Sequence, residues 1–201
     1  MRKQIFFIAL LGLQLLCSSM AASAQESYKV GDFYSDDDKM GVVFWVDESG
    51  QHGKIISLDE SPKLAWTKYE GSIRKFVETF DKNDGGSNFS RICVRGGWQR
   101  DYPAFAWCAE LGEGWYIPAV EEMKMIMSKE VYPIINEALQ GLFQLGAVEF
   151  GLGEDYPLYW TSTEEYTEQP FWVYVLPAGS TSTDHIGEKW REYRVRAVAR
   201  F

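Results

Sequence analysis

Aromatic, carboxylate and imidazole side chains in the last quarter of the chain have the chemistry of a binding surface. Tryptophan and tyrosine rings stack on sugar rings, and the same residues form the energetic centres of protein interfaces. Trp160, Trp172 and Trp190 border two segments that we predict to be loops, 164–169 and 180–190. We therefore expect a ligand to bind there. The candidate residues are Trp160, Glu164, Glu165, Tyr166, Trp172, Asp184, His185 and Trp190.

Nucleophilic catalysis would need an activated nucleophile beside a general base. The sequence has no Gly-x-Ser-x-Gly motif, and its two histidines are His52 and His185. Asp184 precedes His185 and could orient it as a base, although a polar pair in a loop is the more common meaning of such neighbours. We expect a non-catalytic protein. The alternative is a hydrolase-like enzyme that uses Asp184, His185 or a pair of carboxylates.

Metal-binding residue types are sparse, since the chain has 3 Cys and 2 His in total. This is too few for a zinc or iron–sulfur centre of the usual kind. The segment 81–92 begins like a calcium-binding loop, with Asp81 and Asn83 at its first and third positions. Its fifth and twelfth positions are Gly85 and Ile92, which cannot supply the required oxygen ligands. We expect a solvated turn, with calcium as the weaker alternative, and no cofactor.

Four arginines, Arg191, Arg194, Arg196 and Arg200, form a local basic strip in an acidic chain. From Tyr193 to Phe201, apolar residues mostly alternate with these arginines, which predicts a strand with one buried face. The favoured interpretation is a solvated strand face whose arginines pair with carboxylates, and the alternative is an anion site.

The elements that must position these residues divide into three regions. Strands are predicted over 42–46 and 55–58, forming a hairpin, and again over 159–162, 171–176 and 193–201. Helices are predicted after Pro103, after Pro118 and from Pro133 to Gly141. The polar stretch 81–88 and the glycine-rich segment 141–157 are predicted to be irregular. This order predicts an α+β fold with a mostly antiparallel sheet and two or three helices in the middle of the chain.

Composition and charge narrow the range of partners. The chain has 201 residues, 46% of them hydrophobic and 15% aromatic, with a formal net charge of -9. A chain of this length and composition forms one ordinary globular domain. Its acidity disfavours nucleic acid, which attracts clustered Lys and Arg. Among the remaining partners, the tryptophans and tyrosines near the predicted loops favour a glycan or a surface protein.

The first 24 residues are typical of a secretory signal peptide. Arg2 and Lys3 precede an apolar run, 5–16, and the segment ends in the small-residue pattern Ala22-Ser23-Ala24. We predict export to the periplasm, the cell surface or the medium, with 25–201 as a single domain and no transmembrane segment in the mature chain. A lipid anchor through Cys17 is the less favoured alternative. Export permits a disulfide, so a bridge between Cys93 and Cys108 stays open beside two free thiols.

Three strings carry a resemblance to a known family. They are WCAELGEGWYIP (107–118), YWTSTE (159–164) and VRAVARF (195–201). In combination they resemble the Fibrobacter succinogenes major paralogous domain family, which also occurs as the C-terminal domain of a Legionella collagen-like adhesin. The resemblance covers roughly residues 28–201.

The resemblance implies a C-type-lectin-like fold in which a long loop region carries the ligand. It does not fix an activity, because that fold hosts sugar binders, protein binders and an enzyme. The calcium-binding strings of sugar-binding C-type lectins, such as Glu-Pro-Asn, do not occur here. We therefore predict an exported binding or adhesion module. An enzyme on the same fold and a structural subunit of a surface assembly remain as alternatives.

Overall fold

The computed structural model describes residues 27–167 and 169–201. The predicted signal peptide, Cys17 included, lies outside these residues. Among the helices that are described, none is both long enough and apolar enough to cross a bilayer.

Three antiparallel sheets form the frame of the molecule. Their strand orders are β1-β2-β3-β9, β4-β8 and β5-β6-β7. The strands are β1 (Phe33–Ser35), β2 (Met40–Val46), β3 (Gly53–Ser57), β4 (Leu64–Ala65), β5 (Leu158–Glu164), β6 (Trp172–Pro177), β7 (Ile186–Glu188), β8 (Glu192–Tyr193) and β9 (Val198–Arg200). All strand pairings within these sheets are antiparallel. The α+β class and the hairpin between β2 and β3 are confirmed.

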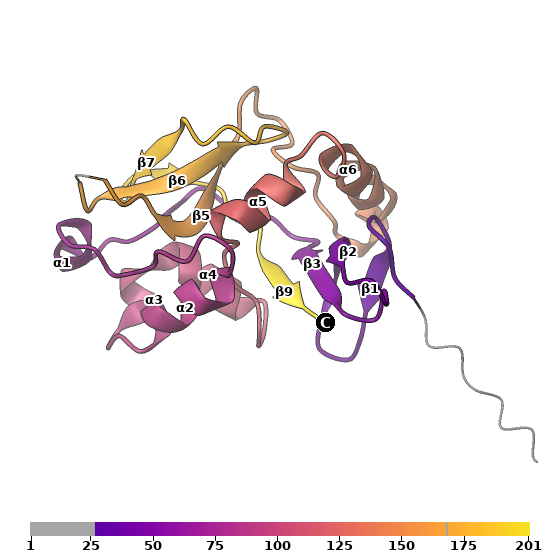
Figure 1. Cartoon of the computed structure of the whole chain (residues 1–201), viewed down its shortest axis with the longest axis horizontal. Helices are drawn as coiled ribbons and strands as arrows, with labels where there is room; N and C mark the ends of the chain where they lie inside the picture. The colour runs from indigo at the N-terminus through magenta and orange to yellow at the C-terminus, as the bar shows by residue number, and fades with distance from the viewer. Residues whose placement is uncertain (1–26, 168) are drawn as a thin grey trace, which may run out of the picture.

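The helices lie in the middle of the chain, as predicted, but the described residues contain six of them rather than two or three. They are α1 (Glu70–Ile73), α2 (Gly85–Cys93), α3 (Trp98–Asp101), α4 (Pro103–Glu110), α5 (Val120–Ile126) and α6 (Tyr132–Gly141), followed by the 3-10 turn η1 (Phe143–Leu145). The extra elements are α1 and α3, which are single turns, and α2. Figure 1 shows α2, α3 and α4 below the β5-β6-β7 sheet, and α6 beside β2.

The sheet containing β2 and β3 is covered on both faces. Val42, Phe44 and Ile56 pack on the apolar side chains of α5 and α6, whereas Val43 and Ile55 pack in a second cluster with residues of α2 and α4. All five side chains are buried. Burying each such side chain contributes about 1.5–3 kcal/mol. The sheet therefore joins the two halves of the core.

Helix α2 occupies part of the stretch that we predicted to be irregular. Asp84 caps it, because its carboxylate accepts the backbone N–H groups of Gly86 (2.9 Å) and Ser87 (3.2 Å). Gly85 is required at the first helical position, since a Cβ there would lie 2.3 Å from the carbonyl oxygen of Ile117. The glycines that suggested a loop allow the helix to begin against another segment.

We expect Asp84→Ala to lower the free energy of unfolding by about 0.5–2 kcal/mol. The substitution removes the cap of α2 and also the partner of Arg200, whose Nη2 lies 2.9 Å from Asp84 Oδ1. Urea unfolding of both proteins measures the change. Asp84→Asn keeps a capping oxygen and should recover most of the loss; a loss equal to that of Asp84→Ala would contradict the capping role.

The C-terminal segment is not the single strand that we predicted. Tyr193 belongs to β8 and Val198 begins β9, and the residues between them cross from one sheet to another. The four arginines do pair with carboxylates, as expected. However, Arg196 is fully buried instead of solvated. The predicted solvent exposure of Arg196 is wrong because backbone carbonyl groups surround its guanidinium on the face that we expected to be open to water.

Candidate functional site

The structure brings two of the predicted binding residues, Trp172 and Trp190, to the same surface hollow of about 800 Å³. Trp172 begins β6, and Trp190 lies in the connection between β7 and β8. The β6–β7 pairing places Trp172 opposite Glu188, two residues before Trp190. The hollow is lined by Trp172, Ile186, Glu188, Trp190, Arg191, Glu192 and Tyr193.

An aromatic cluster forms one wall of this hollow. The ring of Phe171 lies 5.5 Å, between centroids, from those of both Trp172 and Trp190. Such tilted ring pairs contribute about 0.5–1.5 kcal/mol beyond simple burial. Trp190 nevertheless remains 42% exposed. The cluster therefore holds a tryptophan firmly while leaving much of it open to a ligand.

Polar groups line the rest of the hollow. Arg191 Nε donates to Glu188 Oε2 over 3.0 Å, and the Arg191 backbone N–H donates to the Glu188 carbonyl over 2.7 Å. The Glu192 side chain is exposed. These groups present carboxylate acceptors and guanidinium donors next to the aromatic wall. A ligand that carries both hydroxyl donors and acceptors can bond to both kinds of group.

Trp160 lies beneath the hollow instead of lining it. It is fully buried, its indole N–H donates to the Leu64 carbonyl over 2.7 Å, and its ring packs edge-on against Tyr193 at 4.7 Å. Gly187 permits this packing, because a Cβ there would lie 2.6 Å from the Tyr193 ring. Burial also raises the pKa of Tyr193. The prediction that Trp160 contacts a ligand is wrong, and its role is to support Tyr193.

Glu164 is likewise buried, so it does not face a ligand. Its carboxylate accepts the backbone N–H groups of Val77 and Thr79 and pairs with Lys189, which is also fully buried. The Lys189 ammonium additionally donates to the carbonyls of Ser72 (2.9 Å) and Lys75 (3.2 Å). Burial lowers the pKa of Lys189. Sequence reasoning missed Lys189, whose only signal is its place between Glu188 and Trp190 in a segment that we predicted to be a loop.

Glu165 and Tyr166 do not line the hollow, although the Glu165 backbone N–H donates to the carbonyl of Trp172 over 3.0 Å. The Glu165 carboxylate accepts the Thr167 hydroxyl over 2.5 Å and is largely buried. Tyr166 is 72% exposed, and its ring packs against Phe80 (5.0 Å) and Phe76 (5.5 Å). Tyr166 thus belongs to a second exposed aromatic cluster.

Asp184 and His185 do not line the hollow either. Asp184 is exposed, and its carboxylate accepts the Ser182 hydroxyl over 2.9 Å. His185 is half-buried beside Tyr156, with 6.2 Å between ring centroids. In the described residues its buried Nδ1 has no hydrogen-bond partner. Asp184 therefore does not orient the imidazole as a catalytic dyad would require.

Cys93 and Cys108, the two cysteines among the described residues, are free thiols. Cys93 is half-buried at the end of α2, and Cys108 is buried in α4. Burial raises the pKa of both thiols. The bridge that the sequence left open is not formed here.

The segment 81–92, which begins like a calcium-binding loop, makes hydrogen bonds to its own backbone. Asp81 Oδ1 accepts the backbone N–H groups of Asn83 and Asp84, both over 2.9 Å. This is the turn chemistry expected of an aspartate that precedes a helix. Across residues 27–167 and 169–201, no three His, Cys, Asp or Glu side chains converge as metal ligands would.

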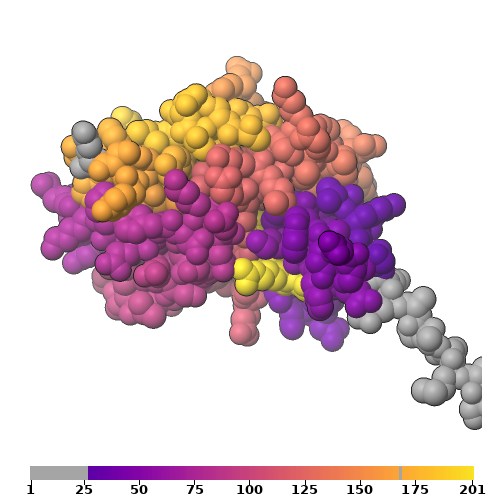
Figure 2. All heavy atoms as spheres, viewed as in Figure 1, coloured from indigo at the N-terminus to yellow at the C-terminus, as the bar shows by residue number. Residues whose placement is uncertain are grey.

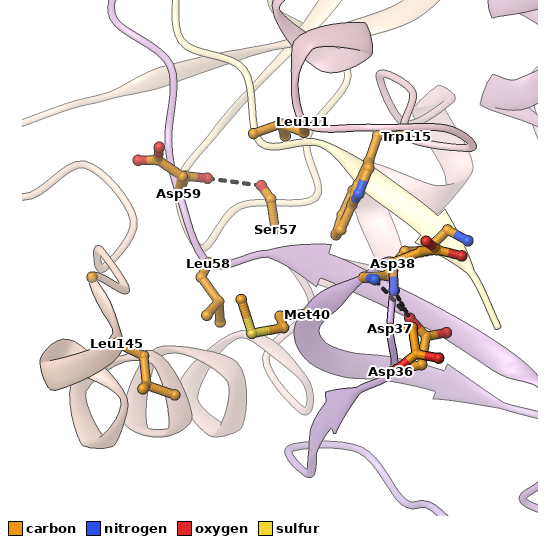
Figure 3. Close-up of a pocket in the computed structure, with 12 residues that line it drawn as sticks. Asp36, Asp37, Asp38, Met40, Ser57, Leu58, Asp59, Leu111, Trp115 and Leu145 are labelled. Atoms are coloured by element: carbon orange, nitrogen blue, oxygen red, sulfur yellow. Dashed lines mark hydrogen bonds between the residues drawn. The ribbon is translucent and has the colours of Figure 1, made fainter.

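A separate hollow of about 550 Å³ lies at the β1-β2-β3-β9 sheet (Figure 3). Its rim carries Asp36, Asp37, Asp38 and Asp59, and its apolar part includes Met40, Leu58, Trp115 and Leu145. Asp36 is committed to the turn, since its Oδ1 accepts the N–H groups of Asp38 (2.9 Å) and Lys39 (2.6 Å). The Tyr34 hydroxyl also donates to Asp36 Oδ2 over 2.7 Å. This bond, together with the bonds from the turn, lowers the pKa of Asp36.

Comparison with known proteins adds no relative from which residue roles could be transferred. No protein-family model matches the chain, and a search of curated proteins finds none that is similar in sequence. The residues and their geometry therefore carry the functional argument.

Proposed function

We propose that this protein is an exported, non-catalytic binding or adhesion module that recognises a glycan in the hollow lined by Trp172 and Trp190. One observation carries the proposal: two tryptophans from separate elements converge beside an exposed carboxylate–guanidinium pair. Sugar rings have apolar faces that stack on indole, and hydroxyl edges that exchange hydrogen bonds with such a pair.

The dimensions and openness of the hollow favour part of a longer glycan over an enclosed small molecule. Its volume of about 800 Å³ lies in the range of ligand sites. Its floor is held by the buried contact between Trp160 and Tyr193, so the site is preformed. A rigid site binds more tightly because little side-chain entropy is lost on binding.

The predicted signal peptide and the family resemblance support a location outside the cytoplasm, where polysaccharides are accessible. An exported chain with strings similar to those of a secreted domain family would meet polysaccharides outside the cytoplasm. The α+β arrangement, with loops between β5, β6 and β7 near the hollow, is compatible with a C-type-lectin-like fold, and we propose that fold for this chain. A surface protein is the alternative ligand, because Trp, Tyr and Arg also dominate protein interfaces.

We expect Trp190→Ala and Trp172→Ala each to weaken binding to a glycan at least tenfold, because a stacking ring is lost from the hollow. A glycan array with the mature protein selects the oligosaccharide, and calorimetric titration measures its Kd. Tyr166→Ala is the matched control, since it removes an exposed ring from the other aromatic cluster and should leave Kd unchanged.

Two outcomes would overturn this function. One is glycan binding that neither tryptophan substitution alters. The other is an empty array and an empty pull-down from cell-surface extracts together with measurable hydrolysis of a polysaccharide, which would favour the enzyme. Loss of that hydrolysis in His185→Ala would then assign it to the imidazole.

A further inference from the structure

A third hollow, of about 510 Å³, lies between the start of α2, the turn before Tyr116 and the end of β9. In Figure 2 the end of β9, in yellow, is visible in a depression between the magenta helices and the indigo N-terminal strands. Its charged and aromatic lining residues are Lys39, Asp84, Phe89, Trp115, Tyr116 and Arg200.

The lining of this hollow has an excess of positive charge, whereas the protein as a whole is acidic. Its lining carries two cations, Lys39 and Arg200, and one carboxylate, Asp84. In the two hollows described above, and in two smaller ones lined by Glu78 and Asp81 and by Glu149, acidic residues outnumber basic ones. In a chain with a net charge of -9, a cavity with an excess of positive charge is a local departure from the global field.

The two cations have unused hydrogen-bonding capacity. Within the described residues, the Lys39 ammonium has no carboxylate within 4.0 Å. Arg200 pairs with Asp84 through Nη2 and also interacts with the Tyr116 hydroxyl, and its five N–H groups exceed what these two partners need. Asp84 Oδ1 is also shared with the backbone N–H groups of Gly86 and Ser87. The carboxylate therefore does not neutralise both cations.

The remainder of the lining is aromatic and hydroxylic. Phe89 is half-buried and exposes part of its ring, while Trp115 and Tyr116 form buried walls. Ser87 and Ser90 contribute hydroxyl groups from the first turns of α2. Apolar walls next to a cationic end are complementary to a ligand that carries a ring and an anionic group.

We propose that this hollow is a second binding site, independent of the glycan hollow, for a small ring-bearing carboxylate. The carboxylate would lie between the Arg200 guanidinium and the Lys39 ammonium, and the ring would pack against Phe89. Such a group occurs at the C-terminal aromatic residue of a peptide and in a uronic acid. Arg200 suits this role because a guanidinium binds a carboxylate through two parallel hydrogen bonds.

Matched pairs of probes test the proposal. Calorimetry with N-acetyl-phenylalanine and with its amide compares a carboxylate with a neutral group on the same ring, and glucuronate with glucose makes the same comparison for a sugar. We expect at least one carboxylate to bind at least tenfold more tightly than its neutral partner. We also expect its Kd to rise in 1 M NaCl, where charges are screened within about 3 Å. The carboxylate that binds identifies the source.

Three variants locate the binding. Arg200→Gln and Lys39→Gln should each weaken it at least tenfold, and Ser90→Trp, at an exposed helical position, should block the hollow sterically. Asp84→Asn keeps a capping oxygen but removes the competing charge, so it should tighten binding. Arg191→Gln, which changes the glycan hollow, should leave the Kd of the carboxylate unchanged.

Failure of this site is distinguishable from failure of the glycan site. The proposal is overturned if neither carboxylate binds at millimolar concentration, or if carboxylates and neutral partners bind alike. It is also overturned if Arg200→Gln, Lys39→Gln and Ser90→Trp all leave Kd unchanged, or if Asp84→Asn weakens binding. Glycan titration of Arg200→Gln should match that of the parent protein in every case.

Discussion

Replacing Lys189 by methionine should lower the free energy of unfolding by about 3–5 kcal/mol, the range for breaking one partner of a buried ion pair. Lys189 and Glu164 both have fully buried side chains. Methionine fills a similar volume but leaves the Glu164 carboxylate without its cation. The carbonyls of Ser72 and Lys75 also lose their donor.

The cost arises from desolvation rather than from lost packing. The backbone N–H groups of Val77 and Thr79 would still bond to the carboxylate of Glu164. They are neutral, however, and cannot offset a full charge that is shielded from water. The Lys189 ammonium also lies 5.1 Å from the centroid of the Trp66 ring, a cation–π contact that would be lost.

Urea unfolding at pH 7 measures this effect, and a double-mutant cycle isolates the pair. We expect Lys189→Met combined with Glu164→Gln to be less destabilising than the sum of the two single substitutions, because the double variant buries no charge. The exposed pair of Arg191 and Glu188 provides the control, and Arg191→Gln should cost no more than about 1 kcal/mol. A loss for Lys189→Met as small as that of the control would contradict the structural role.

Arg196→Leu should have a second large effect, a loss of about 1.5–3 kcal/mol, the range for hydrogen bonds to a charged group. The Glu60 carboxylate keeps Arg194 as an ion-pair partner at 2.8 Å, so it is not left unpaired. The guanidinium of Arg196 bonds to Glu60 Oε1 over 3.1 Å, and it lies 4.5 Å from the centroid of the Phe150 ring. Its remaining bonds go to the carbonyls of Ser57 (3.2 Å), Leu58 (3.0 Å), Asp59 (3.2 Å) and Val148 (2.7 Å). Leucine would remove the Arg196 donor from all four carbonyls, although the Leu58 carbonyl still accepts the Val148 backbone N–H (3.0 Å) and the Asp59 carbonyl still accepts the Ser57 hydroxyl (2.7 Å).

This arginine ties the end of β3 to the glycine-rich segment 141–157. Hydrogen exchange should therefore show faster exchange around Val148 in Arg196→Leu than the global loss of stability explains. Arg196→Lys retains the charge but not the planar fork, so its loss should be intermediate. If the loss in Arg196→Leu were no larger than in Arg191→Gln, the buried network would not be needed for stability.

Much of the architecture follows from local signals in the sequence. The run of β-branched and aromatic residues in β2, followed by a glycine-containing turn, predicted the hairpin with β3. Pro103 predicted the start of α4, because proline costs least at the first position of a helix. The start of α2 was missed, because Gly85 and Gly86 are typical of loops unless another segment packs closely against them.

The candidate site was predicted in part. Trp172 and Trp190 were singled out because they border a loop region, and they do line one hollow. Trp160 and Glu164 were assigned wrongly, because both faces of β5 are buried and its exposure therefore cannot be read from a period of two. The cationic hollow was not predicted, since Lys39 and Arg200 are far apart in the sequence and meet only through folding.

The sequence by itself determined the α+β class, the positions of the four longest strands and of three of the six described helices, and two of the aromatic residues at the proposed glycan site. These depend on local backbone preferences and on the periodicity of apolar residues, which neighbouring residues encode. Only the tertiary structure decided which polar side chains are buried and with which partners, as for Lys189 with Glu164 and Arg196 with Glu60. The physical reason is that desolvation depends on every segment packed around a group, including segments more than 100 residues away along the chain.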